Sequence, residues 1–474
     1  MSVLKAFYQR VAQCPEAVAI SDGADVRTYG WMATAVHRMA EALRKGGCFE
    51  CPEGHVPRVA LDCPNGTAHV LWALAVVQGG GCLVPIPGEL KSVERAELLR
   101  RTACVSIVLC NTDEANVHVD GFSARVEQLR VSGESKIPED EFAQINPVLI
   151  RFSSGTTGDA KGVVLSHESL IERIASGNRR LRITGKDRVL WVLPMAHHFA
   201  VSILLYLSQG ATTILCSSRL ADDMLDAALA NQATVFYGSP FHMAVLAGEP
   251  SGRDWPGLRL AVSTASPLRG EVADSFLKRF KIPITQGYGI IEAGLPLLNT
   301  CHAIDNPLAC GVPDDFQVKL MDGDVEGDEG ELWLKGPGMF DAYLSPWCKS
   351  EEVMCDGWFR SGDLATRAGD GLIRLAGRLK SVINVGGMKC FPEEIESVLM
   401  GHSGVRACRV VAMPDQRWGT VPAAEIIPVD PRQAPSDTEL SIFCSHSLAS
   451  YKVPVFYNFV ESLPKTASGK IKRF

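Results

Sequence analysis

The sequence predicts an α/β protein with a large N-terminal domain of parallel-rich sheets and helices, a small β subdomain, and a small α+β domain at the C-terminus. The chain has 474 residues, and domains usually run to about 100–200 residues, so more than one core is expected. Helix and strand patterns alternate over the first part of the chain, which is typical of parallel sheets with crossover connections. After about residue 310 the pattern changes to short strands separated by turns.

The alternation begins with a helix at residues 31–45, where apolar residues recur at helical spacing: Met32, Val36, Met39, Ala40 and Leu43. A strand, a helix that ends at glycines and a second strand follow at 58–64, 67–81 and 82–86. Further short apolar runs predict strands at 148–154, 188–194, 211–216, 233–240 and 258–264. These strands are expected to form parallel sheets.

The later part of the chain predicts antiparallel strands at 316–322, 330–336 and 371–377. After Gly377 a small α+β unit is expected, with strands at 381–385, 405–413 and 422–428 and helices near 392–401 and 437–449. We place the boundary close to Lys380, which divides the chain into domains 1–379 and 380–474.

Composition and charge exclude several classes of protein. Hydrophobic residues make up 46% and charged residues 21% of the chain, as in soluble globular proteins. The net charge of -7 offers no broad attraction to nucleic acid or to an anionic membrane. The most apolar stretches, near 68–87 and 189–216, are interrupted within the roughly 20 residues that a membrane span needs. We expect a cytoplasmic protein with no nucleic-acid partner and no membrane span.

The 15 cysteines show no repeated spacing. Cys48 and Cys51 form a single C-x-x-C pair without a second pair or nearby histidines, so a zinc site is not predicted. Reduced thiols are the simplest account in a cytosolic protein.

The strongest local motif is SSGTTGDAKG, from Ser153 to Gly162. Its glycines let the backbone approach a phosphate, its hydroxyls and N–H groups are donors, and its lysine adds positive charge. The spacing differs from that of a Walker A loop. Taken alone, the motif is also compatible with a plain polar turn.

This segment resembles the phosphate loop of the adenylate-forming superfamily, which contains acyl- and aryl-CoA synthetases, adenylation domains of nonribosomal peptide synthetases, and luciferases. Six further motifs follow in the order of that superfamily: PMAHHF (194–199), GYGIIEA (287–293), GELWLKGPGMFDAY (330–343), GWFRSGDL (357–364), GRLKSVINVGG (377–387) and PKTASGK (464–470). The likeness runs from about residue 28 to the C-terminus and is closest to acid–CoA ligases.

The resemblance implies that ATP activates a carboxylic acid as an acyl-adenylate, which is then transferred to a thiol, most simply that of CoA. Because two anions must meet in the first step, catalysis consists mainly of positioning and charge neutralisation. The residues that the resemblance assigns to the phosphates are Ser153, Ser154, Gly155, Thr156, Thr157, Gly158 and Lys161. Glu292 and Thr156 are assigned to Mg²⁺, which prefers oxygen ligands.

The same resemblance assigns the adenosine contacts to Ser266, Tyr288, Gly289, Asp363 and Arg378. Four residues are expected to be catalytic: Lys470, Glu292, His197 and Lys161. Lys470 is expected to act in adenylation, and His197 to lie at the mouth of the acid pocket. Lys380 matches the hinge of a mobile C-terminal lid, and Gly387 matches the loop along the pantetheine tunnel, so domain rotation between two half-reactions is implied. The pocket is expected to be lined by His198, Phe199, Tyr237, Ser263, Gly287 and Ile291.

One departure from the superfamily pattern removes a hydrogen-bond donor, because Ile291 stands where the superfamily usually has a threonine. Losing one oxyanion-type donor can cost about 10²–10³ in rate. A slow enzyme, a compensating donor and an unusual substrate are all compatible with this substitution. The substitution also leaves a non-catalytic homologue open as an alternative. An enzyme that loads a carrier protein stays open for another reason, because a carrier supplies the same phosphopantetheine thiol as CoA.

The identity of the acid is only partly indicated. Neither STASPL (263–268) nor VFYGSP (235–240) contains an aspartate that would hold an α-amino group, which argues against an amino acid. An apolar and aromatic lining suits an aryl acid or a medium-length aliphatic acid.

Overall fold

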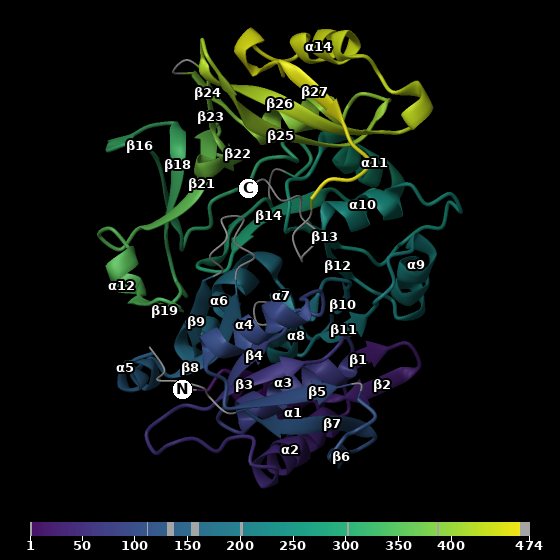
Figure 1. Cartoon of the computed structure of the whole chain (residues 1–474). Coiled ribbons are helices and arrows are strands. Elements are labelled where there is room, and N and C mark those ends of the chain that lie inside the picture. The colour runs from purple at the N-terminus through teal and green to yellow at the C-terminus, as the bar shows by residue number, and fades with distance from the viewer. Residues whose placement is uncertain are drawn as a thin grey trace. The chain divides into compact units, whose positions relative to one another are not determined.

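The computed structural model describes residues 2–110, 112–129, 137–152, 161–199, 202–300, 303–385 and 388–464 (Figure 1). The described chain folds as two compact units. The larger contains the residues up to Gln317 together with Lys335–Gly357, and the smaller contains Val318–Leu334 and the chain from Trp358 onwards. Lys380 lies inside the smaller unit, and its assignment as a hinge between domains 1–379 and 380–474 stays a prediction.

The larger unit contains an eight-stranded sheet, sheet A, whose middle strands are parallel as predicted. Its order is β15 (Gly294–Leu298), β14 (Ile284–Ile290), β13 (Leu260–Ser263), β12 (Val235–Gly238), β10 (Arg188–Trp191), β11 (Thr212–Leu215), β1 (Val18–Asp22) and β2 (Asp25–Thr28). The edge strands β2 and β15 run antiparallel to their neighbours.

A nine-stranded sheet, sheet B, forms the second layer. Its order is β20 (Trp347–Lys349), β19 (Ala342–Leu344), β9 (Gly162–Ser166), β8 (Pro147–Phe152), β4 (Cys82–Pro85), β3 (Arg58–Asp62), β5 (Ser106–Cys110), β7 (Phe122–Gln128) and β6 (Val117–Val119). The central strands β8, β4, β3 and β5 are parallel, and the outer strands are antiparallel. Sheet B therefore joins segments that lie far apart in the sequence.

Helices pack on both faces of sheet A. A core of buried side chains joins the sheet to α9 (Ala221–Ala230), α10 (Pro240–Ala247) and α11 (Gly270–Phe280). On the side of sheet B, α2 (Tyr29–Lys45) contacts β1, β2 and β6, and α6 (His167–Leu181) contacts β9 and β15. The predicted apolar stripe of α2, Met32, Val36, Met39 and Leu43, is buried. Thr28 caps this helix by accepting a hydrogen bond from the backbone N–H of Trp31.

The remaining helices of the larger unit complete its packing. They are α1 (Lys5–Gln13), α3 (Thr67–Gln78), α4 (Ser92–Thr102), α5 (Glu139–Gln144), α7 (Met195–His198), α8 (Ile203–Gln209) and α12 (Ser350–Val353). The core between α4, α5 and sheet B includes Leu98, Phe142 and Ile150. Helix α3 contacts β3 and β4.

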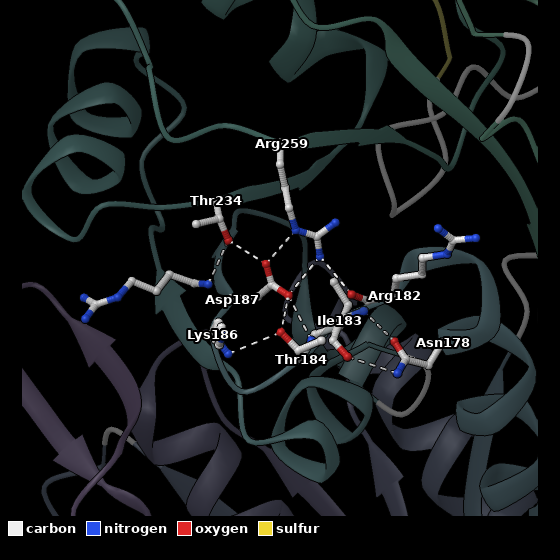
Figure 2. A network of polar contacts seen from close by, with 9 residues as sticks. Asn178, Arg182, Ile183, Thr184, Lys186, Asp187, Thr234 and Arg259 are labelled. Atoms are coloured by element: carbon white, nitrogen blue, oxygen red, sulfur yellow. Dashed lines mark hydrogen bonds and ion pairs between the residues drawn. The ribbon is translucent and has the colours of Figure 1, made fainter.

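A buried carboxylate ties together the amino ends of three neighbouring strands of sheet A. Each strand is preceded by one of the residues involved: Asp187 comes directly before β10, Thr234 before β12 and Arg259 before β13. Figure 2 shows Asp187 accepting hydrogen bonds from Thr234 Oγ1 at 2.9 Å and from Arg259 Nε at 2.7 Å. The backbone N–H of Thr184 donates to the same carboxylate at 2.8 Å. These contacts fix the register of the parallel strands at the edge away from their carboxyl ends.

The smaller unit contains two five-stranded sheets. One has the order β17 (Val325–Glu326), β16 (Gln317–Asp322), β18 (Glu329–Lys335), β21 (Phe359–Arg367) and β22 (Ile373–Arg378). The three predicted strands, β16, β18 and β22, are each antiparallel to a neighbour. The other contains β24 (Met388–Cys390), β23 (Ile383–Val385), β26 (Gly419–Pro428), β25 (Val405–Asp415) and β27 (Phe456–Phe459). Helices α13 (Pro392–Leu399) and α14 (Asp437–Ser445) bury Ile395, Leu399 and Leu440 in its core.

Two further observations apply to the described part of the chain. No helix there combines the length and the apolar character that crossing a membrane requires. Its cysteines are free thiols, and Cys48 lies against the hydroxyl of Ser106 at 3.1 Å.

Candidate active site

The candidate site lies at the carboxyl ends of the parallel strands of sheet A. Trp191 at the end of β10 is in register with Tyr237 of β12, and Ser263 of β13 pairs with Gln286 of β14. The short helix α7, with His197 and His198, follows β10 directly. Ligands of open parallel sheets bind outside the carboxyl ends of the strands. Most of the residues predicted for the acid pocket therefore lie where this fold places a ligand.

An aromatic cluster centres on Trp191. Its ring stacks on Tyr237 with centroids 5.6 Å apart, and it meets Tyr206 and His198 edge-on at 6.1 Å each. Burial raises the pKa of Tyr237 to about 12, although a hydrogen bond with Thr264 opposes the rise. Two predicted pocket residues, His198 and Tyr237, are thus brought together by a tryptophan that sequence reasoning did not single out.

Other predicted pocket residues take different positions. Phe199 is buried against His69, with centroids 6.1 Å apart. Gly287 is close to its neighbours, since a Cβ there would lie 3.1 Å from Leu298 Cδ1. Ile291 is half-buried just beyond β14. These placements are compatible with a pocket along β14, and the assignment of its lining stays a prediction.

Oγ of Ser263 and Oε1 of Gln286, on register partners of β13 and β14, are buried polar atoms that make no hydrogen bond to any described residue, as is Nε1 of Trp191 on β10. Buried polar groups are nearly always satisfied, by water or a ligand where protein partners are missing. The pair therefore fits a polar ligand at the carboxyl ends of these strands.

Tyr343 connects Glu292 and Lys161, the residues predicted for magnesium and phosphate. Its hydroxyl donates to Oε1 of Glu292 at 3.1 Å, and Nζ of Lys161 lies 4.4 Å from its ring centroid. Burial and the charge of Glu292 both raise the pKa of Tyr343. The tyrosine hydroxyl therefore stays a proton donor to the carboxylate at neutral pH.

The buried Arg173 of α6 holds the backbone on either side of Glu292. Its Nη1 donates to the carbonyl of Ile291 at 2.7 Å, its Nη2 to the carbonyl of Glu292 at 2.9 Å, and its Nε to the carbonyl of Gly338. Burial lowers the pKa of Arg173 to about 10, against the opposing charges of Asp341 and Glu292. The guanidinium therefore stays charged and fixes the segment that carries the carboxylate.

A second cation, the half-buried Arg151 near the end of β8, lies within the electrostatic reach of Glu292. Burial lowers its pKa to about 10, and its Nε makes no hydrogen bond to a described residue. The sequence around Arg151 and Arg173 does not indicate a role at the site, because only the tertiary fold brings β8 and α6 beside Glu292.

The residues around Glu292 suit a magnesium ion that arrives with a nucleotide. No cluster of three or more His, Cys, Asp or Glu side chains able to hold a metal occurs among the described residues. Mg²⁺ commonly takes one or two carboxylates and completes its shell with substrate phosphates and water. Glu292, with one oxygen engaged by Tyr343, fits that arrangement.

The two predicted ribose residues lie in the smaller unit and form an ion pair. Asp363 and Arg378 are in register on β21 and β22, with Nε 2.9 Å from Oδ1. The Asp363 side chain is 9% exposed and that of Arg378 is 51% exposed. A buried carboxylate oriented by an exposed arginine is well suited to accept hydrogen bonds from a diol.

The other predicted adenosine residues belong to the larger unit. Tyr288 is buried in β14, Gly289 is exposed beside it, and Ser266 is exposed on the segment after β13. The predicted phosphate loop lies between β8 and β9 in the sequence, and these strands pair at Phe152 and Gly162. Outside the described residues lie Ser153, Ser154, Gly155, Thr156, Thr157, Gly158, Gly387 and Lys470, as does the side chain of Lys380.

Comparison with known proteins gives the family. The model for AMP-binding enzymes matches residues 7–344, and the model for the C-terminal domain of AMP-binding enzymes matches residues 394–470. A feruloyl-CoA synthase from an Amycolatopsis species is 32% identical, over 98% of this chain and 96% of its own. A long-chain-fatty-acid–CoA ligase of Mycobacterium tuberculosis is 27% identical over 98% of this chain and 95% of its own.

A solved structure shows the same fold. The o-succinylbenzoate CoA synthetase of Bacillus subtilis, in complex with its acyl-adenylate, has a TM-score of 0.86 at 22% identity and covers 99% of this chain and 96% of its own. The chain therefore belongs to the AMP-binding enzyme family, which confirms the resemblance found in its motifs. It is an ATP-dependent, AMP-forming acid–thiol ligase of the acyl-CoA synthetase type.

Proposed function

We propose that the enzyme activates an aromatic carboxylic acid and transfers the acyl group to CoA. The observation that carries the aromatic assignment is the stacked pair of Trp191 and Tyr237 at the carboxyl ends of β10 and β12. Flat rings add favourable edge and offset contacts to the burial of their surface. Relatives named for phenylpropanoid acids support the choice: the feruloyl-CoA synthase and a 4-coumarate–CoA ligase of rice, 29% identical over 98% of this chain.

In the first half-reaction the carboxylate oxygen of the acid attacks the α-phosphorus of ATP, and pyrophosphate leaves. Lys161 belongs to the predicted phosphate loop, where a cation would neutralise the leaving phosphates. Magnesium, when bound, offsets further negative charge on the phosphates. Asp363 and Arg378 would hold the ribose, and Lys470 would contact the carboxylate and the α-phosphate.

In the second half-reaction the CoA sulfur attacks the acyl carbonyl and AMP leaves. The thioester and AMP are then the products, together with one proton released from the thiol. We propose that the lid carrying Lys470 rotates about Lys380 between the two half-reactions. The alternative acceptor, a carrier protein, presents the same phosphopantetheine thiol, so the side chains of the site do not distinguish it from CoA.

The test is acid-dependent pyrophosphate release with Mg·ATP over aromatic, fatty and amino acids, followed by thioester detection with CoA or with a phosphopantetheinylated carrier. We expect the highest kcat/KM with aromatic acids and thioester with CoA. Trp191→Leu should raise KM for the aromatic acid about 2–10-fold, because an aromatic contact is worth roughly 0.5–1.5 kcal/mol beyond its burial. Trp255→Phe is the matched control, because Trp255 lies in the core with α9–α11.

A different experimental result would contradict each part of the proposal: the aromatic acid, CoA as the acceptor, and catalysis itself. Preference for fatty acids, unaffected by Trp191→Leu, would reject the aromatic assignment. Thioester on the carrier but not on CoA would reject CoA as the acceptor. A folded protein that releases no pyrophosphate with any acid would instead indicate a non-catalytic homologue.

A further inference from the structure

Helix α7, which carries His197, is held by two side chains from sheet B. Asn65 follows β3, accepts a hydrogen bond from the backbone N–H of Met195 at 2.9 Å, and donates to the carbonyl of Leu193 at 3.1 Å. Glu89 follows β4, and its Oε1 lies 2.7 Å from Nε2 of His197. Both residues come from loops at the carboxyl ends of parallel strands. The imidazole is therefore fixed between the ligand-binding edges of the two sheets.

The contact with Glu89 determines which nitrogen of His197 is available. Partial burial would raise the pKa of Glu89, but hydrogen bonds from His197 and from the backbone bring it below its ordinary value. The carboxylate is therefore ionised at neutral pH and can only accept a hydrogen bond, so Nε2 must carry the proton. Neutral His197 then has its lone pair on Nδ1, which makes no hydrogen bond to a described residue.

The chemistry of the two half-reactions decides where such a base is needed. A carboxylic acid is already ionised at neutral pH, so adenylation requires no proton acceptor. A thiol has a pKa of about 8.5 and reacts as the thiolate, so thioester formation must dispose of a proton. A neutral imidazole supported by a carboxylate is the usual side-chain base for this task.

We propose that Glu89 is a positioning residue that holds His197 with Nδ1 as the proton acceptor for the attacking thiol. The inference rests on the proposed function and concerns its second half-reaction. The thiol proton passes to Nδ1 while the sulfur electron pair forms the bond to the acyl carbon. The bond from that carbon to the phosphate oxygen then breaks, AMP leaves with its electron pair, and His197 returns the proton to water.

Glu89 is the ion-pair partner of His197 among the described residues, with the histidine side chain 14% exposed. The ring of His198 lies edge-on to the ring of Trp191. His69, which packs on Phe199, is kept neutral because burial lowers its pKa to about 4. The carboxylate of Glu89 is therefore the charged group in contact with the imidazole.

The experiment separates the half-reactions in the full-length enzyme. Adenylation is measured as acid-dependent ATP–pyrophosphate exchange without CoA, and thioester formation as a single turnover when CoA is added to preformed enzyme-bound adenylate. The variants are Glu89→Ala, Glu89→Gln, Glu89→Asp and His197→Ala. Glu97→Gln is the control, because this surface carboxylate pairs with Arg100 and Arg101 on α4.

We expect Glu89→Ala to slow thioester formation about 10–100-fold, by analogy with the loss on removing a carboxylate that orients a metal-ligating histidine. Adenylation should change less than about twofold, and Glu89→Asp should recover part of the lost rate. In Glu89→Gln, which keeps a hydrogen-bond acceptor but loses the charge, the acid limb of the thioester pH profile should move to lower pH. His197→Ala should slow thioester formation at least as much as Glu89→Ala.

Equal slowing of both half-reactions by Glu89→Ala would show a merely structural role and overturn the inference. An unchanged rate and pH profile of thioester formation in Glu89→Ala and Glu89→Gln would also overturn it. A wild-type enzyme that forms adenylate but no CoA thioester would contradict the proposed function instead. In that case the same variants are measured with the phosphopantetheinylated carrier, where the same differences are expected.

Discussion

Tyr343 donates a hydrogen bond to Glu292 at 3.1 Å while its ring lies 4.4 Å from Nζ of Lys161. One side chain on β19 thus contacts both a carboxylate and a cation that are assigned to the same chain of phosphates. The carboxylate keeps its second oxygen for another ligand. This relationship predicts that removing only the hydroxyl affects magnesium more than it affects the fold.

Tyr343→Phe should raise the Mg²⁺ concentration required for half-maximal pyrophosphate exchange several-fold. A hydrogen bond to a charged group contributes roughly 1.5–3 kcal/mol, of which only the orienting part is expected to appear in metal binding. Tyr343→Leu, which also removes the ring beside Lys161, should additionally raise the KM for ATP. Wild-type magnesium dependence in both variants would show that Tyr343 does not orient Glu292.

Arg173→Met should lower both the thermal stability and the affinity for Mg·ATP. Three backbone carbonyls lose their donor, and an unsatisfied buried polar group costs about 1–3 kcal/mol. The control is Arg179→Met, because Arg179 lies on the same helix with its side chain 61% exposed. Differential scanning calorimetry and KM measurements compare the two. Equal effects would mean that the carbonyl contacts of Arg173 contribute nothing specific.

Ile291→Thr should raise the rate of adenylation by up to about 10-fold. The new hydroxyl lies on the segment that Arg173 fixes through the Ile291 carbonyl at 2.7 Å. A single well-placed donor can be worth about 10²–10³ in rate, and part of that gain is expected in a site adapted to its absence. Ile291→Val is the control for side-chain size. A threonine variant no faster than the valine variant would indicate that another donor already serves the α-phosphate.

Asp187→Asn should destabilise the larger unit by about 1–3 kcal/mol, because Thr234 and Arg259 lose their charged acceptor. Kinetic constants per folded molecule should not change, since these residues lie at the amino ends of the strands (Figure 2). Urea unfolding at pH 7 measures the difference in stability between wild type and variant. A change in KM for the acid or for ATP would contradict the separation from the site.

The same difference should depend on pH in a defined direction. Burial opposes ionisation, but hydrogen bonds from Arg259, Thr184 and Thr234 keep the pKa of Asp187 below its ordinary value. Because the folded pKa is depressed, the stabilisation is present above the unfolded pKa of about 3.9 and is lost as pH falls through the folded value. The advantage of wild type over Asp187→Asn should therefore be constant from pH 7 to pH 5 and shrink at lower pH.

Local periodicity was sufficient to predict most of the elements. The helix expected at 31–45 is α2, Tyr29–Lys45, and the strand expected at 58–64 is β3, Arg58–Asp62. The pairing of β9 with β19 was not predictable from pattern, because Val164 and Ala342 meet only after the intervening chain has folded. Strand ends also differ by up to three residues, since the last apolar residues of a run often continue into a loop.

For the candidate site too, sequence motifs predicted some of the residues, and others were identified only from contacts in the structure. Asp363 and Arg378 belong to separate motifs, and the structure pairs them across β21 and β22. Tyr343 is the last residue of a motif, yet nothing in the sequence assigned it to Glu292. Arg173, Glu89 and Trp191 belong to no such assignment, because their roles depend on contacts between elements and not on neighbours in the chain. An arginine in a helix looks like a solvated residue until its carbonyl partners are known.

The position of Asp187 has a consequence for how this protein can be changed. Parallel strands give sheet A two chemically different ends: the Asp187 network links the amino ends of the strands, and the carboxyl ends are where open parallel sheets bind their ligands. We expect residues at the carboxyl ends to be exchangeable without loss of the hydrogen bonds at the amino ends. The enzyme is thus a suitable starting point for altering acid preference by directed evolution, with libraries confined to the ends of β10, β12 and β13.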